Sequence, residues 1–504
     1  MQTSQQRIVV NTAAQYTRTI INVCLSLYST RLILAALGQT DFGIYSVVAG
    51  VVSMLSFMTN ALVTTTQRYL SFNHGKNDLE KVYQVFGNSV LLHLVIGIGL
   101  LLVLSAVEYP IVYQLLHIEA DRLNAATAVY FAAVIVLLLA FLTAPFRALF
   151  IARENIVYIS VIDVLDGVLK LLIAIFLTRI TGYDKLIAYS VLLIGISLFN
   201  LIAFAGYALP AFEECHLPRW REWDREHIRG LSGFAGWTIY GTGCVIARNQ
   251  GIAILLNIFC STIANAAYGI AQQVSGAVSF ISVSIANAMN PQIMKAEGAG
   301  DRARMLRLAE YMSKYASLLL ALVAIPLIFE METVLRVWLT EVPEYAVGFC
   351  QLMLLAAVCD QLSYGLTSAN QAIGQIRTYT LVFYSFKLAT LVAIWLCLLA
   401  GVDPVTSVWC FVIVELFGSM LRLVLLKRQA DIDVWHFVVH VLCRVIVPIA
   451  VMAAISYLCV HYIAHPYRLV FTLLCAITGG AAAIWLTALD KSEKQILYNI
   501  LKRR

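Results

Sequence analysis

Residues 84–107 read QVFGNSVLLHLVIGIGLLLVLSAV and contain no Lys, Arg, Asp or Glu. A helix needs about 20 mostly apolar residues to cross a bilayer core about 30 Å thick, so this stretch is long enough to span a membrane. The whole chain has the same character, since 61% of its 504 residues are hydrophobic and only 13% are charged. Soluble domains carry roughly 25% charged residues. The composition therefore excludes a soluble or disordered protein.

Fourteen such segments are predicted along the chain. They centre on residues 10–35, 43–66, 84–107, 125–146, 155–178, 186–209, 231–257, 264–289, 309–329, 346–369, 378–400, 405–426, 437–463 and 467–489. The eleven cysteines form no CxxC motif, so no metal site is expected, and those inside apolar runs are interpreted as small hydrophobes. We predict an all-α polytopic membrane protein with about 14 transmembrane helices and no cofactor.

The distribution of basic residues predicts the orientation. Cytoplasmic loops are enriched in Lys and Arg. Twenty-three of the 35 Lys and Arg residues lie at the N-terminus, in even-numbered loops or at the C-terminus, whereas five lie in odd-numbered loops. This asymmetry indicates an even number of spans with both termini in the cytoplasm. The N-terminal MQTSQQRIVV lacks the features of a cleavable signal, so we expect the first span to be retained.

The chain also contains a weak internal repeat, with three matches in the same order at offsets of roughly 220 residues. The matched stretches are Phe42-Gly43-Ile44-Tyr45 with Tyr268-Gly269-Ile270-Ala271, His74-Gly75-Lys76-Asn77-Asp78 with Glu297-Gly298-Ala299-Gly300-Asp301, and Leu198-Phe199-Asn200 with Leu416-Phe417-Gly418. We therefore predict two pseudo-symmetric six-helix lobes, 1–215 and 216–430, followed by two further helices and a cytoplasmic tail in 431–504. Parallel repeats of this kind place substrate sites between the lobes.

Polar side chains recur at helical spacing in the first, second, seventh and eighth spans. Charged groups deep in a bilayer normally face a bundle interior or a water-filled cavity. Such stripes indicate a cavity, although Ser, Thr and Asn also serve simply to join helices. The candidate substrate-binding residues on these stripes are Arg18, Asn22, Arg31, Asn60, Arg248, Asn249 and Gln272. Arg18 lies about 15 Å into the first span, whereas Arg31 and Arg248 lie nearer the span ends, where snorkelling to the interface is an alternative.

A second group of charged residues lies in the fifth, tenth, eleventh and twelfth spans. Asp163, Asp166 and Lys170 share one face of the fifth span because they are three and four residues apart. Two interpretations remain open for the group: a proton or cation relay, or internal ion pairing, for example of Asp166 with Lys170, that makes burial tolerable. The ion-coupling candidates are Asp163, Asp166, Lys170, Asp360, Lys387 and Glu415.

Together these residues resemble a known superfamily. The stretch Leu37-Gly38 … Asp41-Phe42-Gly43-Ile44-Tyr45, the run to Gln67-Arg68-Tyr69-Leu70, the repeated Gly…Asp loops and the plan of six, six and two spans are similar to the multidrug/oligosaccharidyl-lipid/polysaccharide (MOP) exporters. Within that superfamily the chain most resembles the bacterial polysaccharide repeat-unit flippases of O-antigen or capsule synthesis.

This resemblance implies a MATE-like fold in the bacterial inner membrane, with alternating access through a cavity lined by spans 1, 2, 7 and 8. It implies a polyprenyl-diphosphate-linked oligosaccharide as substrate, with Arg18, Arg31 and Arg248 as candidates to hold the diphosphate. Guanidinium groups match phosphate oxygens bidentately. The other partners implied are membrane lipids and polysaccharide polymerase machinery, and no nucleic acid is expected.

Three alternatives to this function stay open. A lipid II flippase has the same number of spans and arginines in its first span. A MATE-type drug exporter typically carries an Asp and a Pro in its first span, where this chain has two arginines instead, and these would repel a cationic drug. A polytopic glycan polymerase or transferase would be an enzyme, but the odd-numbered loops here are short and contain no nucleophile arrangement or metal-ligand spacing. We therefore do not expect an enzyme.

Overall fold

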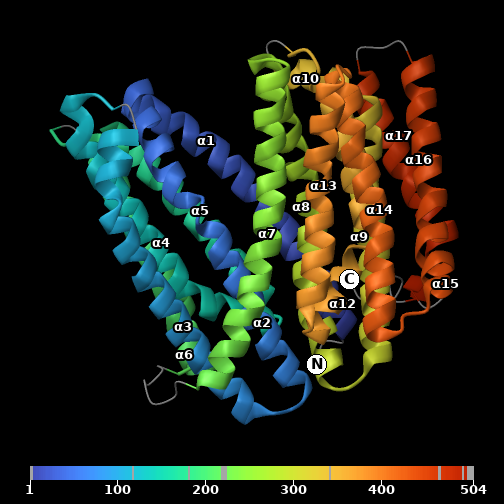
Figure 1. Cartoon of the computed structure of the whole chain (residues 1–504), viewed down its shortest axis with the longest axis horizontal. Coiled ribbons are helices and arrows are strands. Elements are labelled where there is room, and N and C mark those ends of the chain that lie inside the picture. The colour runs from blue at the N-terminus through green and yellow to red at the C-terminus, as the bar shows by residue number, and fades with distance from the viewer. Residues whose placement is uncertain are drawn as a thin grey trace. The chain divides into compact units, whose positions relative to one another are not determined.

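The computed structural model describes residues 4–115, 118–179, 182–216, 224–339, 342–463, 467–490 and 493–495. In this part of the chain the regular elements are helices, and no strand is present. The chain divides into two compact units, unit 1 (residues 1–239) and unit 2 (residues 240–504), with the division inside helix α7 (Arg225–Phe259) (Figure 1). Each unit is described separately below.

Unit 1 contains the first six long helices and the start of α7. In chain order its elements are α1 (Ser4–Ser53), α2 (Ser56–Gly75), α3 (Leu79–Ala106), the short turns η1 (Pro110–Leu115) and η2 (Ala120–Arg122), α4 (Leu123–Ala152), α5 (Ile156–Arg179) and α6 (Lys185–Ala211). Its apolar interior includes Phe86, Tyr130, Phe141 and Phe150, all fully buried. These large rings supply much of the buried apolar area of the unit.

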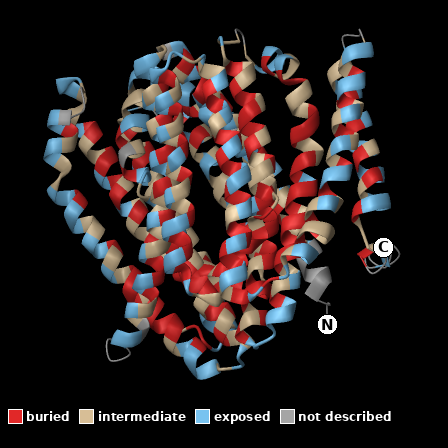
Figure 2. Ribbon diagram, turned by 45° about the vertical axis from the view of Figure 1, so that its right-hand side comes forward, coloured by how far each residue is buried: buried red, intermediate tan, exposed pale blue. Residues whose placement is uncertain are grey.

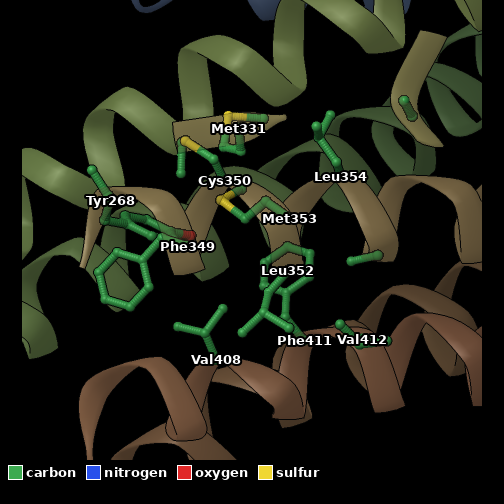
Figure 3. Close-up of a cluster of buried hydrophobic side chains, with 14 of the residues drawn as sticks. Tyr268, Met331, Phe349, Cys350, Leu352, Met353, Leu354, Val408, Phe411 and Val412 are labelled. Atoms are coloured by element: carbon green, nitrogen blue, oxygen red, sulfur yellow. The ribbon is translucent and has the colours of Figure 1, made fainter. Parts of the chain in front are cut away.

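Unit 2 contains the remaining helices. They are α8 (Thr262–Gly298), α9 (Arg302–Phe329), α10 (Met331–Trp338), α11 (Ala346–Gln361), α12 (Tyr364–Ile373), α13 (Ile376–Leu399), α14 (Pro404–Ala430), α15 (Val434–Phe437), η4 (Val438–Leu442), α16 (Cys443–Tyr462), α17 (Arg468–Ala483) and η5 (Ile484–Ala488). In its core, Tyr268 of α8 packs beside Phe349 and Met353 of α11 and Phe411 of α14 (Figure 3).

Eleven helices in the described residues are long and apolar enough to cross a membrane, and the bent pair α11–α12 would make a twelfth. The predicted segment 155–178 corresponds to α5, which is not among these eleven helices. Asp163, Asp166 and Lys170 lower its hydropathy. Large apolar residues such as Leu102 of α3 and Leu172 of α5 are exposed. Along the helices, exposed positions alternate with buried ones (Figure 2). Exposed apolar faces of this extent are typical of lipid contact. The predicted fold class, an all-α polytopic membrane protein, is confirmed.

The boundary between the first two predicted spans is wrong. The sequence predicts separate helices at 10–35 and 43–66, whereas α1 continues to Ser53 across a kink at Gly38, and the predicted second span is divided between α1 and α2. Gly38 has φ of 79°, a conformation that residues with a Cβ rarely adopt, so the chain can change direction there without a loop. Just beyond this kink Arg122 pairs with Asp41, and it also pairs with Asp184 at 2.7 Å.

The repeated Gly…Asp loops have the same backbone conformation in the two units. Asn77 and Gly300 both adopt a left-handed conformation, with φ of 56° and 78°. The next residues, Asp78 and Asp301, cap α3 and α9 by accepting a hydrogen bond from the backbone N–H three residues later, at 3.1 and 2.9 Å. The sequence match at these loops therefore corresponds to a repeated structural motif.

Helix α12 packs closely against α9 at Gly365. A Cβ placed there would lie 2.0 Å from the backbone oxygen of Ala309, so only glycine fits. The Gly365 N–H donates to Ser313 Oγ at 3.0 Å. The predicted tenth span, 346–369, is therefore not one straight helix: α11 and α12 meet at an angle of 45°.

Candidate functional site

The first candidate site in unit 1 is a cluster of two arginines around one carboxylate, which we call the unit 1 ion cluster (Arg18, Arg147 and Asp163). Arg147 of α4 binds both oxygens of Asp163 on α5, with two bonds of 2.8 Å. Arg18 of α1 binds the same carboxylate through one nitrogen at 2.6 Å, and a second nitrogen lies 3.5 Å from Gln15 Oε1. The Arg147 pair is thus the bidentate one, and Arg18 is held at one end only.

The other predicted residues of α5 lie directly beside this cluster. Asp166 pairs with Lys170 at 2.7 Å and accepts a hydrogen bond from Asn200 of α6 at 2.7 Å. The ion pair between Asp166 and Lys170 that the spacing indicated is therefore present. Across the α1–α5 contact, a Cβ at Gly167 would lie 2.8 Å from Asn22 Oδ1, so glycine permits the close approach. That Asn22 oxygen is buried without a hydrogen-bond partner among the described residues.

Unit 2 holds a longer cluster in which cations and carboxylates alternate. We call Arg248, Glu415, Lys387, Asp360 and Arg422 the unit 2 ion cluster. Arg248 Nη1 lies 2.6 Å from Glu415 Oε1, and Lys387 Nζ lies 3.0 Å from the other oxygen of that carboxylate. Lys387 also lies 2.9 Å from Asp360 Oδ1, which Arg422 contacts at 2.8 Å. The side chains of Arg248 and Glu415 are only 6% and 4% exposed, so this pair is almost fully removed from lipid and water.

Helix α14 stabilises the break between α11 and α12. The last carbonyls of a helix have no partner inside it. At the end of α11, Ser419 Oγ donates to the carbonyl oxygen of Cys359 at 2.6 Å, and Arg422 Nη1 donates to that of Asp360 at 2.7 Å. The guanidinium of Arg422 also lies 4.4 Å from the Phe383 ring centroid. Arg422 thus binds both the backbone and the carboxylate of Asp360 at the break. Membrane proteins tolerate broken helices where the free backbone groups are buried in protein.

Both clusters contain one more cation than carboxylate. Unit 1 has two arginines for Asp163, and unit 2 has three cations for Asp360 and Glu415. Charges in the membrane are costly and are normally paired. A site with an excess of positive charge favours an anion over a cation as ligand.

The remaining predicted substrate-binding residues lie in different surroundings. Arg31 and Asn60 are exposed on α1 and α2, whereas Asn249 and Gln272 are half-buried on α7 and α8. Asn249 Oδ1 accepts a bond of 3.3 Å from Arg248 Nε. Within unit 2 the structure thus joins Arg248 to Asn249, to Glu415 and, through that carboxylate, to Lys387.

Sequence reasoning missed two residues of the clusters. Arg147 follows the predicted span 125–146, and Arg422 lies near the end of the predicted span 405–426; both are among the 23 basic residues assigned to the N-terminus, the even-numbered loops and the C-terminus. In the structure α4 continues to Ala152 and α14 to Ala430, so both arginines lie inside helices. The signal was present in the apolar residues that follow each arginine, Ala148 to Ile151 and Leu423 to Leu426. These residues continue the helical pattern past the charge.

A separate ion cluster joins the loops of unit 1. Arg153 binds both oxygens of Glu214 at 2.6 and 2.5 Å, and His74 Nε2 lies 3.3 Å from the same carboxylate. Burial would raise the pKa of Glu214, but the bonds from His74 and Arg153 outweigh burial and lower it to about 2. This carboxylate therefore holds the last turn of α2, the start of the connection between α4 and α5, and the segment that follows α6 together.

No family model matches the sequence, and no curated protein matches it. Several solved structures are similar in fold, and each of the following matches covers 85% of this chain and 96% of the other. The first is a MATE structure in the bent conformation, with a TM-score of 0.75 and 11% sequence identity. The second is an outward-facing multidrug resistance MATE transporter of the MOP superfamily, with a TM-score of 0.71 and 11% identity. The third is a MOP superfamily transporter from Pyrococcus furiosus in which reverse polarity of the binding pocket suggests a different function, with a TM-score of 0.69 and 12% identity. The chain therefore has the fold of the MATE transporters of the MOP superfamily.

Proposed function

We propose that this protein is a transporter that moves a polyprenyl-diphosphate-linked oligosaccharide across the bacterial inner membrane by alternating access, for the synthesis of a surface polysaccharide. The fold supports a membrane transporter. The single observation that carries the choice of substrate is the excess of cations in both ion clusters. A diphosphate is the part of such a substrate that an arginine recognises through paired hydrogen bonds.

Arg18 is the residue that we propose as the main diphosphate contact. Asp163 is already bound at both oxygens by Arg147, so Arg18 is not needed to neutralise it. Of the Arg18 nitrogens, one binds Asp163 and another makes only a 3.5 Å contact to Gln15, which is too long for a strong bond. Nitrogens of this guanidinium can therefore turn to phosphate oxygens while the ion pair stays in place. Asn22, one helical turn further along α1, is proposed as a neighbouring sugar contact.

The other proposed substrate contacts are Arg31 and Asn60 in unit 1 and Arg248, Asn249 and Gln272 in unit 2. Arg248 differs from Arg18 because Glu415 binds it at 2.6 Å in a buried site and the Phe411 ring centroid lies 4.2 Å away. A diphosphate would have to compete with that carboxylate. We therefore expect Arg248 to contribute only after the unit 2 ion cluster rearranges.

Energy coupling through Asp163, Asp166, Lys170, Asp360, Lys387 and Glu415 is part of the same proposal. Each of the four carboxylates contacts at least one Lys or Arg in this conformation. A proton or sodium ion would therefore have to displace a cationic side chain, which would break an ion pair. Such an exchange would link ion binding to helix movement.

Complementation of a strain that lacks its own repeat-unit flippase tests this function. We expect the wild-type protein to restore the surface polymer, Arg18→Gln to reduce it strongly and Arg18→Lys to restore it in part. Arg336→Gln, which removes an exposed arginine of α10, is the matched control and should behave as wild type. Full polymer with Arg18→Gln, in a variant that reaches the membrane at normal levels, would contradict the proposed diphosphate contact.

A MATE-type drug exporter is the second candidate, and the similar solved structures favour it. Such an exporter should protect cells from toxic cationic compounds. We expect no protection, because the excess positive charge in both clusters opposes a cationic ligand. Resistance that depends on Asp163 or Glu415, without any restoration of polymer, would favour the drug exporter instead. A flippase for lipid II would be distinguished by rescue of peptidoglycan synthesis in place of surface polysaccharide.

Both termini are proposed to lie in the cytoplasm. With fourteen crossings, this orientation puts the connection between α13 and α14, at residues 400–403, on the outer side of the membrane. That connection contains no Lys or Arg, whereas α14 ends at the other side with Lys427 and Arg428. This contrast supports the orientation, because basic residues collect on the cytoplasmic side.

A further inference from the structure

Two cysteine thiols contact each other across a tight hairpin of unit 2. Cys397 Sγ on α13 lies 3.7 Å from Cys410 Sγ on α14. All eleven cysteines of the chain are free thiols in this structure. A disulfide bond is about 2.05 Å long, so a movement of the two sulfur atoms toward each other by about 1.7 Å would bring them to bonding distance.

The hairpin itself fixes this arrangement. Helix α13 ends at Leu399 and α14 begins at Pro404. Gly401, with φ of 74°, lets the chain turn sharply, and the N–H of Val402 donates to the carbonyl oxygen of Cys397 at 3.0 Å. The last turn of α13 and the first turns of α14 are therefore held side by side.

The surroundings of the two thiols place them near the edge of the bilayer. Cys397 lies in the last turn of α13, and Cys410 lies about 9 Å along α14 from its first residue. Trp395 and Trp409, each close in sequence to one of these thiols, are 43% and 46% exposed. Exposed tryptophans gather where the membrane meets water. Both thiols are half-buried, and both lie toward the end of the hairpin that the connection between α13 and α14 closes.

We propose that Cys397 and Cys410 form a disulfide bond on the outer face of the membrane. The inference depends on the orientation given with the proposed function, because the bacterial periplasm is oxidising and the cytoplasm is reducing. The oxidant is a protein disulfide of that compartment. One Cys thiolate attacks this external disulfide and forms a mixed disulfide, with release of the first external thiol.

The second cysteine then attacks the mixed disulfide and releases the second external thiol. Two S–H bonds are lost from the protein, one S–S bond forms, and one external disulfide is reduced to two thiols. The bond would join α13 to α14 within unit 2 and would not join the two units. It would therefore stiffen one hairpin, and substrate transport should not depend on it.

Peptide mapping of the full-length protein tests the bond. Cells are treated with a membrane-permeable alkylating agent before lysis, and the protein is purified without reductant and digested. We expect a peptide pair linked through Cys397 and Cys410 that separates on reduction. The buried Cys350 of α11 is the internal control and should be recovered as a free thiol that is alkylated only after denaturation. Cys397→Ser should abolish the linked pair and leave Cys410 free.

Thermal unfolding in detergent provides the second measurement. Addition of dithiothreitol should lower the apparent melting temperature of the wild-type protein by a few degrees and leave that of Cys397→Ser unchanged. Recovery of both cysteines as free thiols from cells overturns the proposal. Diamide treatment of the purified protein then shows which premise is wrong. A linked pair that forms only with diamide means that the hairpin faces the reducing side of the membrane. The absence of a linked pair even with diamide means that the two thiols are not adjacent. Transport by Cys397→Ser at the wild-type rate would separate this result from any failure of the proposed function.

Discussion

Removal of the Glu415 charge should destabilise unit 2 strongly. Glu415→Gln keeps the size of the side chain but leaves Arg248 without a carboxylate in a site where its side chain is only 6% exposed. At an effective dielectric constant of about 20, each of the two contacts that Glu415 makes, at 2.6 and 3.0 Å, contributes about 6 kcal/mol of attraction between unit charges. Part of this lost attraction is offset, because the variant no longer has to remove a charged carboxylate from water. We expect a net loss of about 3–5 kcal/mol of unfolding free energy, the usual cost of breaking a buried ion pair.

A double-mutant cycle in mixed detergent micelles measures this interaction. The double variant Arg248→Gln/Glu415→Gln removes one charge of each sign and so keeps the net charge of the cluster. It should be more stable than Glu415→Gln alone by about 2 kcal/mol, because no unpaired arginine is left buried. The exposed pair of Arg336 and Glu332, with side chains 71% and 62% exposed, is the matched control, with an expected coupling below about 1 kcal/mol. A double variant no more stable than Glu415→Gln would refute the reasoning.

Two other predictions concern stability. Gly365→Ala should lower the unfolding free energy by at least about 2 kcal/mol, because the new Cβ would lie 2.0 Å from the Ala309 carbonyl oxygen. Gly206→Ala on α6 is the control: it has open space around it and should be neutral or stabilising. The melting temperatures of the two variants test this difference. The pKa of Glu214 is lowered from 4.5 to about 2, so the ionised carboxylate should stabilise the folded protein by about 3 kcal/mol above pH 4.5. This stabilisation should be lost as the pH falls toward 2 and the carboxylate takes up a proton. Glu214→Gln should therefore be less stable at pH 7 and lose less stability on acidification; parallel pH profiles for both proteins would contradict this assignment.

The helices that were predicted best have long apolar runs and local end signals. The prediction of 378–400 corresponds to α13, which runs from 376 to 399, and the prediction of 405–426 corresponds to α14, which begins at Pro404 after the capping residue Asp403. Hydropathy and capping act within a few residues of each helix end, so they can be read from the local sequence. The all-helical membrane class follows from the same signals.

The features that could not be predicted depend on contacts between distant residues. The bend between α11 and α12 is stabilised by Ser419 and Arg422 of α14, some sixty residues further along the chain. Nothing near residue 362 indicates that these groups will bind the free carbonyls. In the same way, helical spacing predicts the pair of Asp166 and Lys170 within α5. The partner of Asp163 is Arg147 of α4, which is sixteen residues away across a helix connection. Spacing on one helix predicts neighbours on that helix only.

Arg18 is the residue proposed to recognise the diphosphate of a lipid-linked oligosaccharide. The most direct test of this role is the initial rate at which purified protein in proteoliposomes moves a polyprenyl-diphosphate-linked oligosaccharide between leaflets. Arg18→Gln is expected to fold, because Asp163 keeps both bonds from Arg147. Loss of a charge-assisted bond to phosphate, about 1.5–3 kcal/mol, predicts a rate about 10- to 100-fold below that of the wild type, with Arg18→Lys between the two. Equal rates for wild type and Arg18→Gln, or no movement by the wild-type protein, would contradict the claim.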